Sequence, residues 1–128
     1  MDNQKKLKIA LLSNAGFSIF NGLVLLFFYK PIAELMFIEQ ANLLFYLGIG
    51  LLLFAGSIYW IASRRVLNKR LVTSIIIQDW LWIIGSVLIL LFQLFGLSFL
   101  GYEIILIVAL IVAIFAILQN RYLQRIEA

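Results

Sequence analysis

The chain has 128 residues, of which 65% are hydrophobic and only 12% are charged. Soluble domains are about 45–50% apolar and about 25% charged, and a short chain has too little interior to bury this excess. The balance excludes an ordinary water-soluble domain and favours lipid as the solvent. The sequence has no cysteine and no histidine, which excludes disulfides, thiolate chemistry and the commonest metal ligand.

Four apolar segments are long enough to cross a bilayer, which takes about 20 residues of helix. They cover approximately residues 9–29, 43–62, 71–95 and 102–119. The first is expected to stop at Pro31, and no small-residue cleavage site follows it, so we interpret it as an uncleaved span rather than a signal peptide. Short links make consecutive helices antiparallel neighbours. The sequence predicts an all-α, up-down four-helix bundle, a single integral membrane domain over residues 1–128.

The basic residues fall unevenly on the two ends of this bundle. Nine of the ten precede the first segment, join the second to the third, or follow the fourth, and only Lys30 lies elsewhere. Because lysine and arginine mark the cytoplasmic face, we expect both termini inside the cell, in a membrane such as the bacterial inner membrane. A net charge of +4 can indicate nucleic-acid binding, but here the placement of the basic residues is explained by membrane topology. The bilayer rather than nucleic acid is therefore the expected partner.

Asp79 is the only ionisable residue well inside a predicted span. It lies nine residues beyond Arg70, at a depth of about 13 Å for 1.5 Å per helical residue. A charge at that depth costs about 2.5–3.5 kcal/mol on insertion scales, and such residues usually serve a function. The spans contain no lysine or arginine that could pair with it. Asp79 is therefore the leading candidate for a binding residue.

Polar and aromatic residues extend this candidate site along the third segment. Gln78 precedes Asp79, and Trp82 and Ser86 follow three and seven residues later on the same helical face. Trp82 is expected to donate its indole N–H to the carboxyl group or to offer its ring face to a cation.

The first segment carries a second polar stripe. Asn14 and Ser18 share one face, with Asn21 beside them. Asn14 and Asn21 are expected to hydrogen-bond Asp79 or a shared ligand, and the alternative is that the stripe only holds helices together. Apart from Tyr102 and Glu103 at its start, the fourth segment has no polar residue before Gln119 and is interpreted as a packing helix.

Two patterns carry a resemblance to known proteins. The third segment reads D-W-L-W at 79–82 and G-S at 85–86, and the fourth reads A-xxx-A-xx-A-xx-Q over 109–119. In these patterns the chain resembles small uncharacterised four-span bacterial inner-membrane proteins, which implies a membrane location and no particular activity. Small multidrug-resistance transporters are similar in size and span count. They carry an essential acid in the first span, where this chain has Asn14 instead.

The leading functional hypothesis is a non-enzymatic protein that binds, and in one version transports, a small apolar or amphipathic molecule between the first and third segments. The expected ligand-binding residues are Asp79, Asn14, Ser18, Asn21, Gln78, Trp82 and Ser86. One alternative is an accessory or scaffold subunit that packs against a second copy or a larger membrane partner. Another is a membrane enzyme in which Asp79 moves a proton on a lipid-soluble substrate. No catalytic motif, metal site or cofactor site is predicted.

Overall fold

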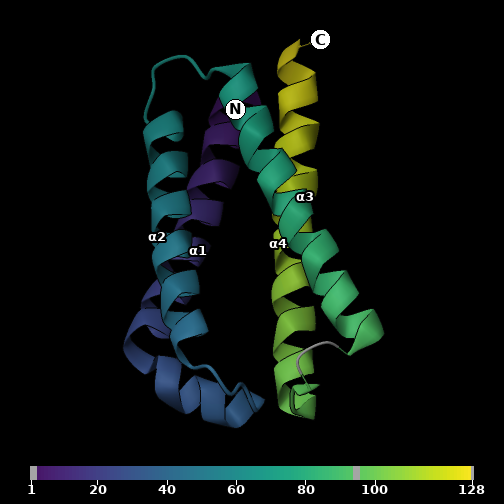
Figure 1. Ribbon diagram of the computed structural model, residues 1–128. Coiled ribbons are helices and arrows are strands. Elements are labelled where there is room, and N and C mark those ends of the chain that lie inside the picture. Colours follow the sequence, from purple (N-terminus) through teal and green to yellow (C-terminus); the bar gives the residue numbers. More distant parts are fainter. Residues whose placement is uncertain (1–2, 94–95, 128) are drawn as a thin grey trace.

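The computed structural model describes residues 3–93 and 96–127, and within them the chain forms four helices (Figure 1). They are α1 (Asn3–Met36), α2 (Asn42–Ala62), α3 (Lys69–Phe92) and α4 (Phe99–Glu127). Each helix is long and apolar enough to cross a membrane. Consecutive helices run in opposite directions, so both ends of the chain lie at the same end of the molecule (Figure 1). The predicted all-helical, four-helix architecture is confirmed.

The ends of the helices are set by local features such as capping side chains, and not by hydropathy alone. α2 matches the predicted segment closely, and α4 continues well beyond the predicted end at residue 119. α3 begins after Asn68, whose side chain accepts hydrogen bonds from the backbone N–H groups of Arg70 and Leu71 at 3.0 and 3.4 Å. It ends at Phe92, before Gln93 adopts a left-handed conformation with φ 48°. This end lies close to the approximate boundary predicted at residue 95, and residues 94–95 lie outside the described part of the chain.

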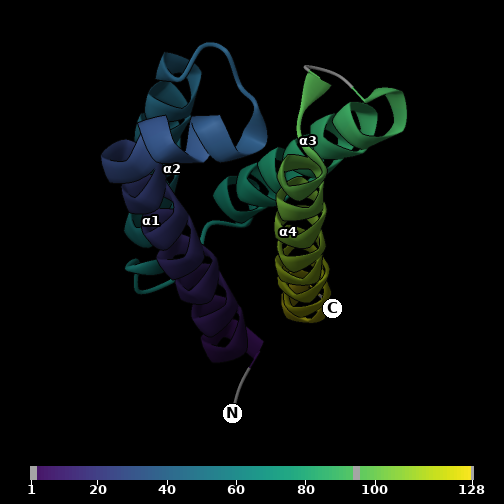
Figure 2. The ribbon, with the colours of Figure 1, turned by 90° about the horizontal axis from the view of Figure 1, so that it is seen from below.

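The first straight part of α1 ends in a kink before Pro31, where the first span is expected to stop, and a second helical segment follows the kink within α1. Phe28 has non-helical angles (φ −123°, ψ 24°), and the helix continues beyond it to Met36. The proline has no N–H to offer the carbonyl of Phe27, and its ring crowds that carbonyl, so the helix kinks one turn earlier. The segment after the kink lies across the end of the bundle (Figures 1 and 2).

The kinked end of α1 is tied to the link between α3 and α4. Ser98 donates its backbone N–H to the carbonyl oxygen of Met36 at 2.9 Å and its hydroxyl to that of Leu35 at 2.7 Å. Gly101 lies beside them, and a Cβ there would lie 3.2 Å from the Cβ of Met36. This contact joins the two halves of the chain at the end of the bundle opposite the termini.

The helices associate as two pairs, α1 with α2 and α3 with α4. α1 also packs against α4, whereas α2 and α3 make little contact. Gly22 and Gly48 allow the backbones of α1 and α2 to approach closely, since a Cβ on Gly48 would lie 2.9 Å from the carbonyl oxygen of Gly22. Seen along the bundle, α1 and α2 lie on one side and α3 and α4 on the other (Figure 2).

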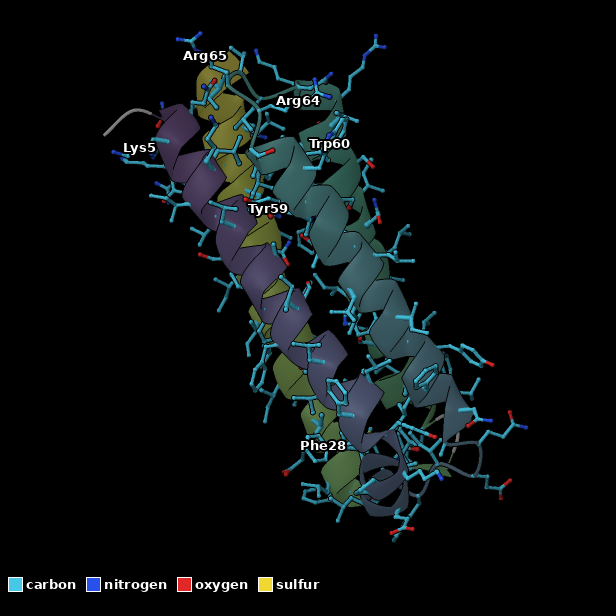
Figure 3. The ribbon with its side chains drawn as sticks, turned by 90° about the vertical axis from the view of Figure 1, so that its left-hand side faces the viewer. Lys5, Phe28, Tyr59, Trp60, Arg64 and Arg65 are labelled. Carbon is cyan, nitrogen blue, oxygen red and sulfur yellow. The ribbon has the colours of Figure 1, made fainter. Side chains whose placement is uncertain are left out.

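A cluster of buried apolar side chains lies at the end of the bundle that carries the termini, and we call this region the packed half. Its core consists of Leu7, Leu11, Ala15, Ala55, Ile58, Ile61, Ala62, Leu67, Val72, Ile75, Ile76 and Leu123, all buried. The side chains of Lys5, Arg64 and Arg65 lie around this end, which we call the basic end (Figure 3). Lys8 of α1 donates a hydrogen bond to the carbonyl oxygen of Arg65 at 3.3 Å, so the link between α2 and α3 is held against α1.

The outer surface of the bundle is apolar along much of its length. Phe20, Leu53 and Leu91, from three different helices, are each about two-thirds exposed or more. In the most apolar stretch of each helix, no more than 33% of the residues are buried. Soluble proteins rarely expose contiguous apolar patches larger than a few hundred Å². Lipid tails would cover this surface without the cost that water imposes.

Candidate functional site

A buried polar cluster joins three helices where the packed half ends. Asp79 of α3, Asn14 of α1 and Gln119 of α4 are 3%, 1% and 0% exposed. Nδ2 of Asn14 lies 3.0 Å from Oδ2 and 3.3 Å from Oδ1 of Asp79, and Nε2 of Gln119 lies 2.8 Å from the same Oδ2. Asn14 also donates to Oε1 of Gln119 at 3.1 Å. We call these three residues the polar triad.

The polar triad gives the buried carboxyl group hydrogen-bond donors without neutralising its charge. A buried polar group is costly unless it is hydrogen-bonded, and the two amide groups supply donors on two sides of Asp79. Amides carry no net charge, however. The negative charge of an ionised Asp79 can therefore be balanced only by a proton or by a cation that the triad does not contain.

The structure brings together some of the residues that the sequence predicts for this site. The expected hydrogen bond from Asn14 to Asp79 is confirmed. Asn21 instead donates to the carbonyl oxygen of Phe17 in its own helix at 2.8 Å, so it does not bond Asp79, and its expected bond to a shared ligand stays a prediction.

Two neighbours of Asp79 on α3 also stay outside the polar triad. Gln78 is exposed and donates to the hydroxyl oxygen of Ser74 at 3.2 Å. The indole Nε1 of Trp82 is buried, and among the described residues it has no hydrogen-bond partner, so the predicted bond to the carboxyl group does not form. Nearby, Ser86 donates to the backbone carbonyl oxygen of Trp82 at 2.9 Å.

Gln119 is the functional candidate that the sequence interpretation missed. The prediction that α4 only packs is wrong at this position, because its amide completes the polar triad. The signal was present in the spacing of the buried face of α4, which carries Ala109, Val112, Ala116, Gln119 and Leu123. Intervals of three and four residues place a side chain on the inner face of a helix. The predicted end of the span at residue 119 hid this pattern, since it placed Gln119 at the membrane boundary.

A cavity of about 1180 Å³ extends from the polar triad toward the end of the bundle opposite the termini. We call the surrounding region the hollow half. Helical residues from all four helices line the cavity, which is somewhat larger than the roughly 300–1,000 Å³ of typical ligand pockets. All the residues predicted to bind a ligand lie along its wall, namely Asn14, Ser18, Asn21, Gln78, Asp79, Trp82 and Ser86. Their role in binding stays a prediction.

The cavity is bounded at both ends and opens to the side. The packed half lies beyond the polar triad, and at the other end Ile32 and Met36 of the kinked α1 segment line the cavity together with Leu97. α2 and α3 both contribute to the wall but make little contact with each other, and the two helices diverge toward the opposite end (Figure 1). The opening between them would face the lipid if the helices span a bilayer.

The polar and acidic side chains that line the cavity are suited to anchoring a polar head group. Of the described residues that line it, Asp79 and Glu39 are acidic and none is basic. Within the described ranges, no group of three histidine, cysteine, aspartate or glutamate side chains could hold a metal ion. The polar triad contains a single titratable group, Asp79, beside two amides. This set can hold a head group by charge and hydrogen bonds.

Comparison of the chain with protein-family models, with curated proteins and with solved structures gives no match.

Proposed function

We propose that this chain is a multi-pass protein of the bacterial inner membrane whose basic end, with both termini, faces the cytoplasm. Nine of its ten basic residues support this orientation. At the basic end, the guanidinium group of Arg64 lies 4.2 Å from the ring centre of Trp60 (Figure 3). Tryptophan and arginine are typical of the boundary between hydrocarbon and head groups, where a ring can face lipid while a charge faces water.

We propose further that the hollow half binds a small apolar or amphipathic molecule, with Asp79 as the polar anchor. The observation that carries this proposal is a cavity that starts at a buried carboxyl group and opens sideways between α2 and α3. A molecule dissolved in the bilayer would enter through that opening without crossing a water layer. Its polar group would reach the triad, and its apolar part would lie against the apolar side chains of the wall.

The length of the cavity limits what it can hold. Asp79 and Ile89 both line it, and ten residues of helix separate them, which corresponds to about 15 Å. A short alkyl chain or a compact ring system fits that distance. A lipid with two long acyl chains would extend beyond the cavity into the bilayer.

A cavity-filling experiment tests this proposal. Gly50 and Gly85 line the cavity, and a Cβ on either would meet nothing within 4 Å, so each can become phenylalanine without a clash at that atom. The probe is dodecanol with a photoreactive diazirine on its tail, added to the protein in phosphatidylcholine nanodiscs. We expect it to label residues of the cavity wall, as located by mass spectrometry. Gly50→Phe and Gly85→Phe should reduce that labelling several-fold.

Gly16→Phe and Gly56→Phe are the matched controls. Both glycines are exposed and have open space around a Cβ, but neither lines the cavity. These variants should leave labelling of the wall unchanged. Labelling restricted to outward-facing residues, with no response to Gly50→Phe or Gly85→Phe, would show that the cavity takes up no such molecule.

The same opening also fits a second function, that of an accessory subunit whose partner helix lies between α2 and α3. A spanning helix is about 30 Å long, roughly twice the distance available in the hollow half. A partner would therefore have to displace either the packed half or the kinked α1 segment, which makes a small ligand the better fit. If the accessory role were correct, Gly50→Phe and Gly85→Phe would release a co-purifying protein or convert a dimer to a monomer in native mass spectrometry.

A further inference from the structure

We infer that the ligand of the hollow half carries a positively charged head group, which binds beside Asp79, and a single apolar tail that extends toward the kinked end of α1. This inference rests on the proposed function and specifies the class of molecule, a cationic amphiphile. It draws on the charges of the wall, the two oxygens of Asp79, the aromatic side chains and the direction of the cavity.

The charges that line the cavity favour a cation. Asp79 lies at one end and Glu39 at the other, and no described residue of the wall is basic. In a site with low-dielectric walls, charges of a single sign concentrate the opposite sign far more strongly than they would in water. Lys30, in α1 just before Pro31, is the only basic residue at this end of the bundle; it is exposed, and its ammonium group lies 5.9 Å from the ring centre of Tyr29.

The polar triad leaves one oxygen of Asp79 with spare capacity. Oδ2 accepts hydrogen bonds at 2.8 and 3.0 Å, from Gln119 and Asn14 respectively. Among the described residues, Oδ1 accepts one hydrogen bond, the longer 3.3 Å bond from Asn14. A carboxylate offers about four acceptor sites, so Oδ1 can still accept from or lie against a further group. An ammonium group there would supply the positive charge that the two amides lack.

Aromatic rings in the cavity wall also favour a cation over an anion near the carboxyl group of Asp79. Phe17 of α1, Phe54 of α2 and Trp82 of α3 all line the cavity. The face of an aromatic ring attracts a cation by roughly 0.5–2 kcal/mol, with tryptophan the strongest and dehydrated sites the most favourable. Aromatic faces do not attract an anionic head group in this way. The rings therefore reinforce the sign that Asp79 selects.

The rest of the wall suits an apolar tail. Beyond Asp79 the α3 side is formed by Trp82, Gly85 and Ile89, and the α2 side by residues such as Leu47 and Leu51. These side chains lead about 15 Å along the helices, as counted from the ten residues between Asp79 and Ile89. A neutral hydrocarbon would fill this space equally well, so the head group and not the tail distinguishes the ligand class.

A displacement experiment in the phosphatidylcholine nanodiscs described above tests the charge of the head group. The competitors are dodecyltrimethylammonium, dodecanol and dodecyl sulfate, which share one tail and carry a positive, a neutral and a negative head. Each is added against the photoreactive dodecanol, and labelling of the cavity wall is read out. We expect dodecyltrimethylammonium to displace the probe at about a tenfold lower mole fraction than dodecanol, equivalent to about 1.4 kcal/mol. Dodecyl sulfate should displace it least.

Asp79→Asn removes the charge while keeping the shape of the side chain, and it should abolish the difference between the cationic and neutral competitors. Glu103→Gln, which removes the charge of an exposed carboxylate of α4 that does not line the cavity, is the control and should preserve that difference. Equal displacement by all three competitors, or preference for the sulfate, overturns the inference even if Asp79→Asn does not fold. Specific labelling without charge preference would leave the proposed function standing, whereas no labelling of the wall would contradict both.

Discussion

In the packed half, Leu11, Ile58 and Ile75 fill the space where the helices converge, whereas in the hollow half the same helices surround a cavity of about 1180 Å³. The connections explain the difference. At the basic end, the link from α2 to α3 brings the two helix pairs together, and Leu67 in that link is buried in the core. At the opposite end, the links join helices within a pair. There α2 and α3 are free to diverge.

Two glycines of α2 show the difference between a tight helix crossing and the wall of the cavity. Gly48 lies in the tight crossing of α1 and α2, where a Cβ would meet the backbone of the neighbouring helix. Gly50, two residues later on the same helix, faces the cavity and has open space around a Cβ. One helix therefore holds its partner closely on one face and leaves room on another, and substitutions at these positions separate the two roles.

The largest effect is expected from Gly48→Leu. A Cβ at this position would lie 2.9 Å from the carbonyl oxygen of Gly22 and 3.1 Å from the backbone nitrogen of Leu26, and backbone atoms cannot move aside as a side chain can. Overpacking of this kind costs roughly 3 kcal/mol, at the upper end of the usual range. Thermal unfolding in detergent should show a large loss of stability for Gly48→Leu and almost none for Gly50→Leu. Similar losses in both variants would contradict the close crossing.

The next largest loss of stability is expected when an isoleucine of the packed half is shortened to alanine, and the same change in the hollow half provides the comparison. Ile75 is 1% exposed in the packed half, and Ile89 lies on the same helix along the cavity wall. Ile75→Ala should cost about 2 kcal/mol, because it leaves a void among side chains that cannot collapse into it. Ile89→Ala should cost well under half as much, since it only enlarges an existing space. Equal destabilisation, measured by chemical or thermal unfolding, would show that the hollow half is packed in solution.

The border between the halves is tested by Gln119→Leu. This change removes a donor from a buried carboxyl group, and buried polar contacts between membrane helices are worth about 0.6–1.7 kcal/mol. We expect a loss near 1.5 kcal/mol, which should become smaller when Asp79 is also changed to leucine, because the lost partner is then absent. Gln78→Leu is the control and should have little effect, since Gln78 is exposed and bonds only Ser74 among the described residues. A cost for Gln119→Leu that is independent of Asp79 would argue against the polar triad.

The sequence was sufficient for those features that depend on local composition. Hydropathy located four helices, and the polar side chains inside the first and third segments predicted the hydrogen bond from Asn14 to Asp79, which does form. These predictions succeed because helix rise is constant and lipid imposes a minimum length.

Features that depend on how helices cross could not be predicted in the same way. Hydropathy does not report the divergence of α2 from α3, so the cavity has no sequence signal of its own. Pro31 indicated a break, but only the packing of the following segment against Ser98 decides that the helix resumes. Trp82 has no hydrogen-bond partner for its indole among the described residues, and Gln119 points inward, because of how α3 and α4 are rotated about their axes. The spacing of three and four residues on α4 would have revealed the position of Gln119, but no comparable pattern marks Trp82.

The smallest expected effect has the opposite sign and lies in the hollow half. Gly85 is in the middle of α3 and lines the cavity, and a Cβ there would meet nothing within 4 Å. Gly85→Ala should stabilise the protein by about 0.5 kcal/mol, because alanine restricts the unfolded chain and favours the helix without a steric cost. Gly22→Ala, where a Cβ would lie 3.0 Å from the carbonyl oxygen of Gly48, should instead destabilise it. If thermal unfolding showed a loss for Gly85→Ala as well, α3 would have to lie closer to its neighbours than the cavity allows, and the space proposed for the ligand would not exist.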